Sequence, residues 1–399
     1  MTKIITAILA LAMVLLDIIA YRRLKSYGAG KPVIYAFCVA VLFSYLLILL
    51  TPFFMFIFIT ADNSQFMMKF SMSILTGYLF FSVARLFLYL FWLPTKSRKW
   101  MWTGVAVSSL LFASFMYGAL VTRTDIEVKE VETRFTGLPK AFEGYRIAFI
   151  SDIHIGSMWD AGSELENLAR TIESVDADIL LFGGDLVNIH HSELSSEILE
   201  KLSSIKGSQG TFAVFGNHDT GSYVNGSTEE FRERNKASLE QAACSAGWVF
   251  LKDSTVYIRR GNDSIAITGI DYSEELLRFK HSMNRIDCFD VSRIYNDVPD
   301  SVFNITVSHL PQLWHSLCEG GYSDLTLSGH IHAMQIKIGQ LSPAALMYDE
   351  WSGLYESENG KLYINDGIGS VGFFARLGAR PEVTVLELKC EEADIKTHF

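Results

Sequence analysis

Four stretches in the first 121 residues consist almost entirely of apolar side chains. They cover residues 4–21, 33–60, 70–92 and 101–121. A helix of this length, rising about 1.5 Å per residue, crosses the roughly 30 Å of a bilayer's hydrocarbon core. Helices buried in a soluble core would show a polar face at a 3.6-residue spacing, whereas these stretches are apolar all round. We therefore expect residues 1–121 to form a membrane domain of four transmembrane helices, and residues 122–399 to form a second domain.

The two predicted domains differ in charge. Of the 34 Lys and Arg and the 44 Asp and Glu residues, ten basic and two acidic ones precede residue 122, so the net charge is +8 there and −18 in the remainder. The acidic domain has no basic stripe interleaved with aromatic residues, so no nucleic-acid binding is expected. The five cysteines form no CxxC pair and indicate neither a zinc knuckle nor a disulfide framework.

The loops between the apolar stretches predict an orientation. Residues 21–32 and 94–100 hold seven Lys and Arg and no acidic residue. Loops of this kind stay in the cytoplasm. Four passes then place both termini on the other side, so we predict a multi-pass protein of the plasma or inner membrane with an extracytoplasmic acidic domain.

Asp17 and Arg85 are the only charged residues within the four stretches. Two arrangements would satisfy them inside a membrane. They form an ion pair between the first and third helices, or each side chain extends separately to the interface.

The acidic domain contains five short apolar runs that each end at polar residues. The runs 145–150, 179–182, 211–215, 303–307 and 325–327 lead into SDIH, GGD, GNHD, SH and SGHIH, and helical patterns at 163–174 and 192–204 separate the first three. In open α/β sheets the carboxyl ends of the strands line the crevice that binds ligands. We therefore expect the polar groups to converge there, where their oxygen and imidazole ligands suit Mn, Fe or Zn rather than an all-oxygen Ca site.

The ordered series SDIH, GGDLVN, GNHD, SH and GHIH resembles the motifs of calcineurin-like metallophosphoesterases, from residue 145 to the C-terminus. The ending, residues 372–388, is similar to that of the bacterial membrane-associated branch of this superfamily. The resemblance implies an α/β fold of two mixed β-sheets packed face to face with flanking helices, here preceded by the four transmembrane helices.

The resemblance also implies a site for two divalent ions of Mn, Fe, Zn or Mg. One ion would be held by Asp152, His154, Asp185 and His332, and the other by Asp185, Asn217, His309 and His330, with Asp185 as the bridge. Two such ions about 3.5–4 Å apart activate a shared water and polarise phosphorus. On an extended segment, His330 and His332 would point to the same side and both reach the site.

His218 follows the ligand Asn217 and would stabilise phosphoryl charge or protonate the leaving oxygen. Many relatives carry Asp at the position of Asn188, where it orients this histidine. The Asn188 amide oxygen can accept an imidazole N–H but cannot stabilise an imidazolium as a carboxylate would. Asp219 supports the site or serves only as a turn residue.

Other basic residues near the motifs have two interpretations. In one interpretation His190 and His191 contact substrate at the rim of the site, and in the other they are solvated loop residues. Arg376 and Arg380 bind an anionic head group or are ordinary surface residues.

The sequence therefore predicts a membrane-anchored hydrolase of phosphate monoesters, diesters or pyrophosphates. A lipid-linked substrate is a candidate because the helices keep the catalytic domain at a bilayer surface. The alternatives are a non-catalytic membrane scaffold or receptor that uses the same fold to bind a ligand, and a transporter regulated by the domain. A complete set of metal ligands argues against the scaffold, and the scarcity of polar groups in the apolar stretches argues against the transporter.

Overall fold

The computed structural model describes residues 2–57, 60, 64–95 and 97–391. The chain divides into two compact units. A helical unit holds most of the first 120 residues together with Gly372–Ala375, and a second unit holds Val121–Val371 and the chain from Arg376 onward.

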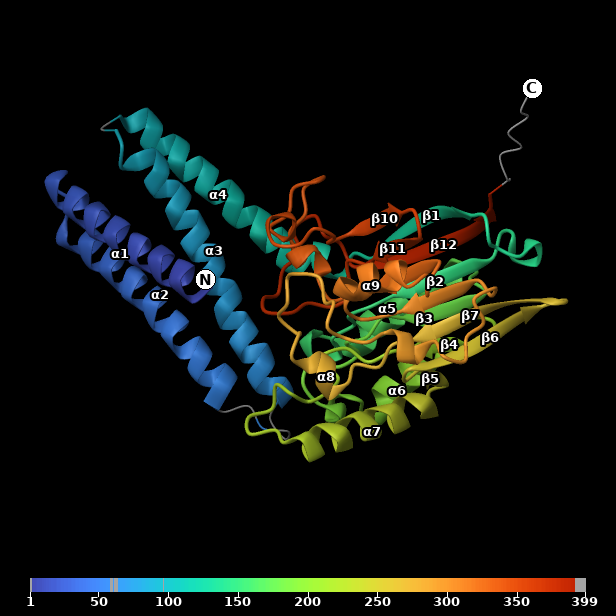
Figure 1. Ribbon diagram of the computed structural model, residues 1–399. Helices are drawn as coiled ribbons and strands as arrows, with labels where there is room; N and C mark the ends of the chain where they lie inside the picture. Colours follow the sequence, from blue (N-terminus) through green and yellow to red (C-terminus); the bar gives the residue numbers. More distant parts are fainter. Residues whose placement is uncertain (1, 58–59, 61–63, 96, 392–399) are drawn as a thin grey trace, which may run out of the picture. The chain divides into compact units, whose positions relative to one another are not determined.

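The helical unit is built from four helices (Figure 1): α1 (Thr2–Ser26), α2 (Lys31–Ile57), α3 (Ser64–Trp92) and α4 (Arg98–Leu120). Within the described part of the chain, three segments are long and apolar enough to cross a membrane: Lys31–Leu50, Gln65–Trp92 and Arg98–Thr124. The remaining predicted span lies in α1, which is helical but is not one of these three. The structure thus supports three candidate spans and not clearly four.

Asp17 and Arg85 lie against each other inside the helical unit. Their side chains are buried, and Arg85 Nη1 is 3.5 Å from Asp17 Oδ2. The hydroxyls of Tyr45 and Tyr89 donate to the two Asp17 oxygens at 2.5 and 2.7 Å, and Arg85 Nη1 also donates to Ser44 Oγ at 3.2 Å. The ion-pair arrangement is therefore confirmed.

The second unit contains two mixed six-stranded sheets (Figure 1). The first has the order β1-β12-β2-β3-β4-β5, and its strands are β1 (Glu127–Phe135), β2 (Arg146–Ile150), β3 (Ile179–Phe182), β4 (Thr211–Ala213), β5 (Trp248–Phe250) and β12 (Glu382–Cys390). The second has the order β10-β11-β9-β8-β7-β6, and its strands are β6 (Ser254–Arg260), β7 (Asp263–Gly269), β8 (Asn304–Val307), β9 (Leu325–Ser328), β10 (Gly353–Ser357) and β11 (Gly360–Ile364). The consecutive neighbours from β2 to β5 are parallel, as are those from β7 through β8 and β9 to β11.

The inner faces of the two sheets share one hydrophobic core. Phe149 and Leu181 of the first sheet belong to the same buried cluster as Ile267, Ile305 and Leu327 of the second. The strands β3, β8 and β9 are buried at every position. Continuous apolar runs of this kind are typical of parallel strands covered on both sides. The predicted pair of mixed, packed sheets is confirmed.

Helices cover the outer faces of the sheets. The helices α5 (Ala161–Ser174), α6 (Ser196–Ser203) and α7 (Glu229–Ser245) contribute Leu168, Leu202 and Leu239 to a cluster with the outer side chains of the first sheet. The helix α9 (Trp314–Glu319) packs Trp314 with Leu362 of the second sheet. One further short helix is α8 (Glu274–Leu277), and the 3₁₀ turns are η1 (Thr122–Thr124), η2 (Lys140–Phe142), η3 (Ile155–Ser157), η4 (His191–Glu193), η5 (Ser292–Ile294), η6 (Pro311–Leu313), η7 (His332–Gln335) and η8 (Ala344–Leu346).

Candidate metal centre

Five parallel strands bring the predicted ligands to one place. The strands β2, β3, β4, β8 and β9 end at Ile150, Phe182, Ala213, Val307 and Ser328, and each is followed within four residues by at least one predicted ligand. Six of the ligand side chains are buried and His330 is half-buried. The seven residues brought together are Asp152, His154, Asp185, Asn217, His309, His330 and His332.

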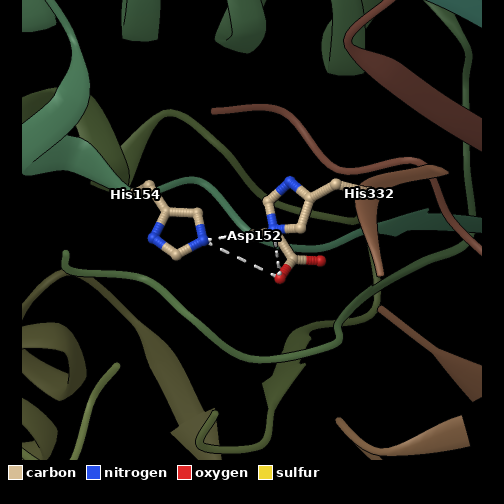
Figure 2. A group of neighbouring side chains, drawn as sticks. All are labelled: Asp152, His154 and His332. Carbon is tan, nitrogen blue, oxygen red and sulfur yellow. Dashed lines mark hydrogen bonds and ion pairs between the residues drawn. The ribbon is translucent and has the colours of Figure 1, made fainter. Parts of the chain in front are cut away.

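The first cluster joins the loops after β2 and β9 (Figure 2). His332 Nε2 lies 3.0 Å from Asp152 Oδ1, and His154 Nε2 lies 3.9 Å from the same oxygen. The Nε2 atoms of His154 and His332 are 3.2 Å apart. Asp185 Oδ2 lies 3.6 Å from His154 Nε2 and completes the group that the sequence predicts for one ion.

The second cluster shares Asp185 with the first. His309 Nε2 lies 3.3 Å from Asp185 Oδ2 and 3.0 Å from Asn217 Oδ1. His330 Nδ1 lies 3.2 Å from His309 Nε2. One oxygen of Asp185 therefore faces imidazoles of both clusters, which is the position required of a bridging ligand.

The donor set fits metal ions better than it fits hydrogen bonding alone. Two pairs of imidazole nitrogens, His154 with His332 and His309 with His330, face each other at 3.2 Å. Each pair can share at most one proton, and two buried carboxylates are costly without cations to neutralise them. Three overlapping groups have ligand atoms within 4.8 Å of one another: Asp152 with His154 and His332, Asp185 with His154 and His218, and Asp152 with Asp185 and His309. Nitrogen and oxygen ligands at this spacing can hold Mn, Fe or Zn.

Electrostatics keep the carboxyl groups ionised. Burial by itself would raise the pKa of Asp152 and of Asp185, but His332 beside the first and His309 beside the second hold each pKa below its usual value. Burial lowers the pKa of His154. Burial also opposes the ionisation of His309, but the carboxylate of Asp185 raises the pKa of His309 to about 9, so a bound ion would have to displace a proton from this ring. Ionised carboxylates and neutral imidazoles are the forms that coordinate a metal.

The ligand loops contain unusual backbone conformations. Five of the seven predicted ligands have a positive φ: Asp152 (54°), His154 (46°), Asp185 (62°), His330 (73°) and His332 (55°). The left-handed region costs a non-glycine residue roughly 1–2 kcal/mol, and such strain concentrates at functional sites. The expectation of an extended segment at His330 and His332 is wrong, because both residues have a left-handed backbone and η7 begins at His332. Both rings nevertheless lie in the cluster.

His218 is held by the loop that carries Asn188. Its backbone N–H donates to Asp185 Oδ1 at 2.8 Å, and its Nδ1 bonds the backbone oxygen of Asn188 at 2.6 Å. The amide group of the Asn188 side chain is buried with no hydrogen-bond partner among the described residues. The expected contact with the amide oxygen of Asn188 is therefore replaced by one with its main chain, and burial lowers the pKa of His218.

Asp219 supports the ligand loops from behind. Its carboxylate accepts the N–H groups of Asp185 and Gly216, each at 2.8 Å, and of Val187 at 3.1 Å. Burial and the charge of Asp185 raise the pKa of Asp219. Glycine is required at position 216, where the loop after β4 passes close to Asp185, because a Cβ there would lie 2.1 Å from Asp185 Oδ1.

Glu193 is a supporting residue that the sequence analysis missed. Its buried carboxylate accepts four backbone N–H groups, from Gly156, Asn188, Ile189 and His190, at 2.6–3.2 Å. It thus ties the loop after β2 to the loop after β3. The available signal was the spacing of His190 and Glu193, which form a capping box around η4.

The other basic residues make local contacts. His190 Nδ1 lies 3.0 Å from Ser192 Oγ, and His191 Nδ1 lies 3.1 Å from Asn235 Oδ1. Arg376 is fully buried and donates to the carbonyl oxygens of its own loop, so it is neither a surface residue nor exposed to a head group. Arg380 forms an ion pair with Asp125 at 2.8 Å.

The fold and the site define a two-sheet α/β domain with a buried carboxylate–imidazole centre at the carboxyl ends of its parallel strands. Residues 145–334 match the model of the calcineurin-like phosphoesterase family. The chain therefore contains a calcineurin-like metallophosphoesterase domain.

The relatives include membrane-associated proteins. The chain is 30% identical over 283 residues to a transmembrane protein with metallophosphoesterase domain of Danio rerio, covering 69% of this chain and 60% of that protein. It is 28% identical over 291 residues to the uncharacterized metallophosphoesterase YkoQ of Bacillus subtilis, covering 70% of this chain and 97% of the relative. It is also 25% identical over 293 residues to the UDP-2,3-diacylglucosamine pyrophosphatase LpxG of Chlamydia muridarum, covering 62% of this chain and 86% of that one.

Proposed function

We propose that this protein is a membrane-anchored hydrolase that cleaves phosphate monoesters, diesters or pyrophosphates with two divalent metal ions. The observation that carries the proposal is the position of Asp185 Oδ2, 3.6 Å from His154 Nε2 in one cluster and 3.3 Å from His309 Nε2 in the other. A single carboxylate oxygen between two imidazole groups fits a two-metal centre.

The chain offers a complete set of ligands for each ion. Asp152, His154, Asp185 and His332 would hold one ion, and Asp185, Asn217, His309 and His330 would hold the other. When bound, the ions supply a hydroxide nucleophile near neutral pH and stabilise charge on the phosphoryl oxygens. The bond from His309 Nδ1 to the carbonyl oxygen of Gly183 at 2.8 Å orients the ring with its Nε2 toward the centre, where Nε2 would coordinate an ion.

His218 is the side chain that would transfer a proton during the reaction. Because Nδ1 is engaged with Asn188 O, Nε2 is the ring nitrogen left to meet the substrate. The ring packs edge to face against His154, with the ring centroids 4.7 Å apart, which keeps it beside the centre. From there it would stabilise the phosphoryl oxygens or pass a proton to the leaving oxygen.

A lipid-linked substrate is the most consistent choice. The apolar helices support anchoring in a membrane by three or four spans. The basic loops at residues 21–32 and 94–100 favour a topology with these loops in the cytoplasm and the catalytic domain outside it. LpxG, by its name, acts on a sugar nucleotide pyrophosphate that carries two acyl groups. Anchoring raises the concentration of lipid head groups around a domain held at the bilayer surface.

The test is metal-dependent hydrolysis by the full chain purified in detergent. Protein stripped of metal with a chelator would be assayed with added Mn, Zn or Mg on a chromogenic phosphodiester, a monoester and a lipid pyrophosphate. We expect activity that returns with metal, a loss of both metal and activity in Asp185→Asn, and a loss of activity with normal metal content in His218→Ala.

Asp300→Asn, a change at an exposed carboxylate, is the matched control for the loss of one charge. Full activity in Asp185→Asn would exclude the bridging role. Tight ion binding without hydrolysis of any of the three substrate classes would instead favour the scaffold or receptor alternative.

A further inference from the structure

Tyr223 touches two of the groups on which the proposed reaction depends. It lies in the segment between β4 and α7, a few residues after the GNHD motif, and no motif includes it. Its hydroxyl lies 2.9 Å from Asn217 Nδ2, and its ring is stacked on the ring of His218 with the centroids 4.3 Å apart and the planes 18° apart.

The hydroxyl determines which end of the Asn217 amide faces the centre. Nδ2 donates to the Tyr223 oxygen, and this directs Oδ1 toward the cluster, 3.0 Å from His309 Nε2. An amide coordinates a cation through its oxygen, whereas its NH₂ group is only a donor. A rotation of the amide by half a turn would place a donor at the ligand position, and the bond to Tyr223 opposes this rotation.

The ring of Tyr223 determines the plane of His218. The Nδ1 bond to Asn188 O fixes one point of the imidazole but allows the ring to swing about it. Stacking on Tyr223 and the perpendicular contact with His154, at interplanar angles of 18° and 89°, restrict that swing from two sides. Stacked aromatic rings attract each other, so the contact favours one plane of the imidazole.

Tyr223 is itself held in place. The Lys280 Nζ lies over its ring, 4.6 Å from the centroid. A cation above an aromatic face is attracted by the ring quadrupole. Lys280 lies in the segment after α8, whereas Asn217 and His218 lie in the loop after β4. Residues from two separate segments therefore hold Tyr223 in place.

We infer that Tyr223 is a positioning residue that orients the metal ligand Asn217 through its hydroxyl and the proton-transfer residue His218 through its ring. The inference rests on the proposed function for the role of His218. The two contacts can be separated by mutation, because Tyr223→Phe removes only the hydroxyl and Tyr223→Leu removes the hydroxyl and the aromatic face.

The experiment measures metal affinity and turnover separately on the full chain in detergent. Titration calorimetry with Mn or Zn on stripped protein gives the affinities without any substrate. We expect Tyr223→Phe to bind one of the two ions about 10–100-fold more weakly, the usual effect of losing a partner of a metal ligand. Its kcat at saturating metal should stay within about threefold of wild type.

Tyr223→Leu should show the same weakened binding and a further loss in kcat. The loss should be larger for an alkyl phosphate ester than for a nitrophenyl ester, because a poor leaving group depends more on a donated proton. A purely structural defect would lower both rates equally. Tyr295→Phe is the matched control, since it removes another buried tyrosine hydroxyl, bonded to Thr306 at 2.8 Å, away from the centre.

Wild-type metal affinity in Tyr223→Phe would overturn the role of the hydroxyl. A wild-type kcat in Tyr223→Leu, or a loss that is equal for both leaving groups, would overturn the role of the ring. Melting curves of both variants report folding, and the Phe variant is nearly isosteric. If the wild-type protein bound two ions but hydrolysed nothing, the proposed function would fail while the calorimetric comparison still decided the role of the hydroxyl.

Discussion

The Nε2 atoms of His154 and His332 face each other at 3.2 Å, and both lie beside Asp152 Oδ1. Two imidazole nitrogens at this distance need a proton or a cation between them. We therefore expect removal of metal by a chelator to lower the melting temperature of the full chain, and added Mn or Zn to restore it. At a metal concentration 100 times the dissociation constant, binding stabilises by about 2.7 kcal/mol. A melting curve that does not respond to chelator or metal would contradict this arrangement.

The contact between His218 and Asn188 uses the main chain, so the side chain of Asn188 should be dispensable for orienting the ring. We expect Asn188→Ala to keep kcat within about threefold of wild type, because the 2.6 Å bond from His218 Nδ1 to the backbone oxygen remains. His218→Ala should lower kcat by about 10²–10⁴-fold. Steady-state kinetics of the two variants at saturating metal provide the comparison. Equal losses in both would show that the amide side chain is needed.

Substitution of Glu193 should lower the free energy of unfolding strongly, although this residue is not a predicted metal ligand. Glu193→Ala would leave four buried N–H groups without their acceptor, and each such group costs about 1–3 kcal/mol. We expect the unfolding free energy of the catalytic unit to fall by at least about 3 kcal/mol, measured by urea denaturation of the full chain. Glu197→Ala, at an exposed position of α6, should change it by less than about 1 kcal/mol. Similar effects of the two substitutions would show that the hydrogen bonds of Glu193 to the loops after β2 and β3 do not stabilise the fold.

Lys337 should stabilise the fold in a pH-dependent way through Asp366. Lys337 Nζ lies 2.9 Å from Asp366 Oδ2, and although burial opposes ionisation, Lys129 and Lys337 lower the pKa of this carboxyl. A lowered folded-state pKa gives stability that is present above the ordinary value of about 4 and is lost as the pH falls through the folded value.

Lys337→Met should therefore destabilise by about 1–2 kcal/mol at pH 7, less than a fully buried pair because the lysine is partly exposed and Lys129 remains. The difference from wild type should shrink as the pH falls below about 4. Lys361→Met, which removes a cation paired with the exposed Glu356, should have little effect at either pH. A difference that grows with acidity would contradict the assignment.

The pair of Asp17 and Arg85 should show strong coupling within the helical unit. Asp17→Leu leaves Arg85 buried without its counter-ion and should lower the melting temperature and the yield of folded protein. Changing both residues to Leu removes the charges together and should recover much of the loss. A double-mutant cycle of melting temperatures in detergent measures the coupling. Additive effects would mean that the 3.5 Å contact contributes nothing.

The strands and their terminal ligands were accessible from sequence because two local signals coincide. The apolar runs at 179–182 and 303–307 stop at Gly183 and Ser308, and predicted ligands follow within two residues. The chemistry of Asp, His and Asn at several strand ends then indicates one crevice. The ion pair of Asp17 and Arg85 was one of two arrangements that the sequence left open, because each charge could also have extended separately to the interface. The structure decides for the pair.

The details that depend on tertiary contacts were not accessible. Glu193 also accepts the N–H of Gly156, 37 residues earlier in the chain, and no local pattern shows that contact. Tyr223 lies only six residues after Asn217, but its residue type does not show that it turns back onto Asn217 and His218. The Asn188 contact was assigned to the wrong atom because a residue type suggests a side-chain bond, whereas the loop presents its carbonyl oxygen. The loop at His330 was expected to be extended, and no local pattern there indicates a left-handed backbone.

Five predicted metal ligands adopt the left-handed conformation, which costs backbone energy for these residue types. The side chains that suit catalysis therefore lower the stability of the fold at these positions. Glycine or asparagine would adopt these angles at lower cost than Asp152, His154, Asp185, His330 or His332. In the absence of bound metal, a chain that no longer performs the chemistry would therefore gain thermal tolerance by giving up these side chains, whereas a chain that still binds metal would lose the stabilisation that the ions provide. Descendants that lose hydrolysis should drift toward glycine or asparagine at these positions, and thermostabilising selections without an activity screen would yield inactive proteins.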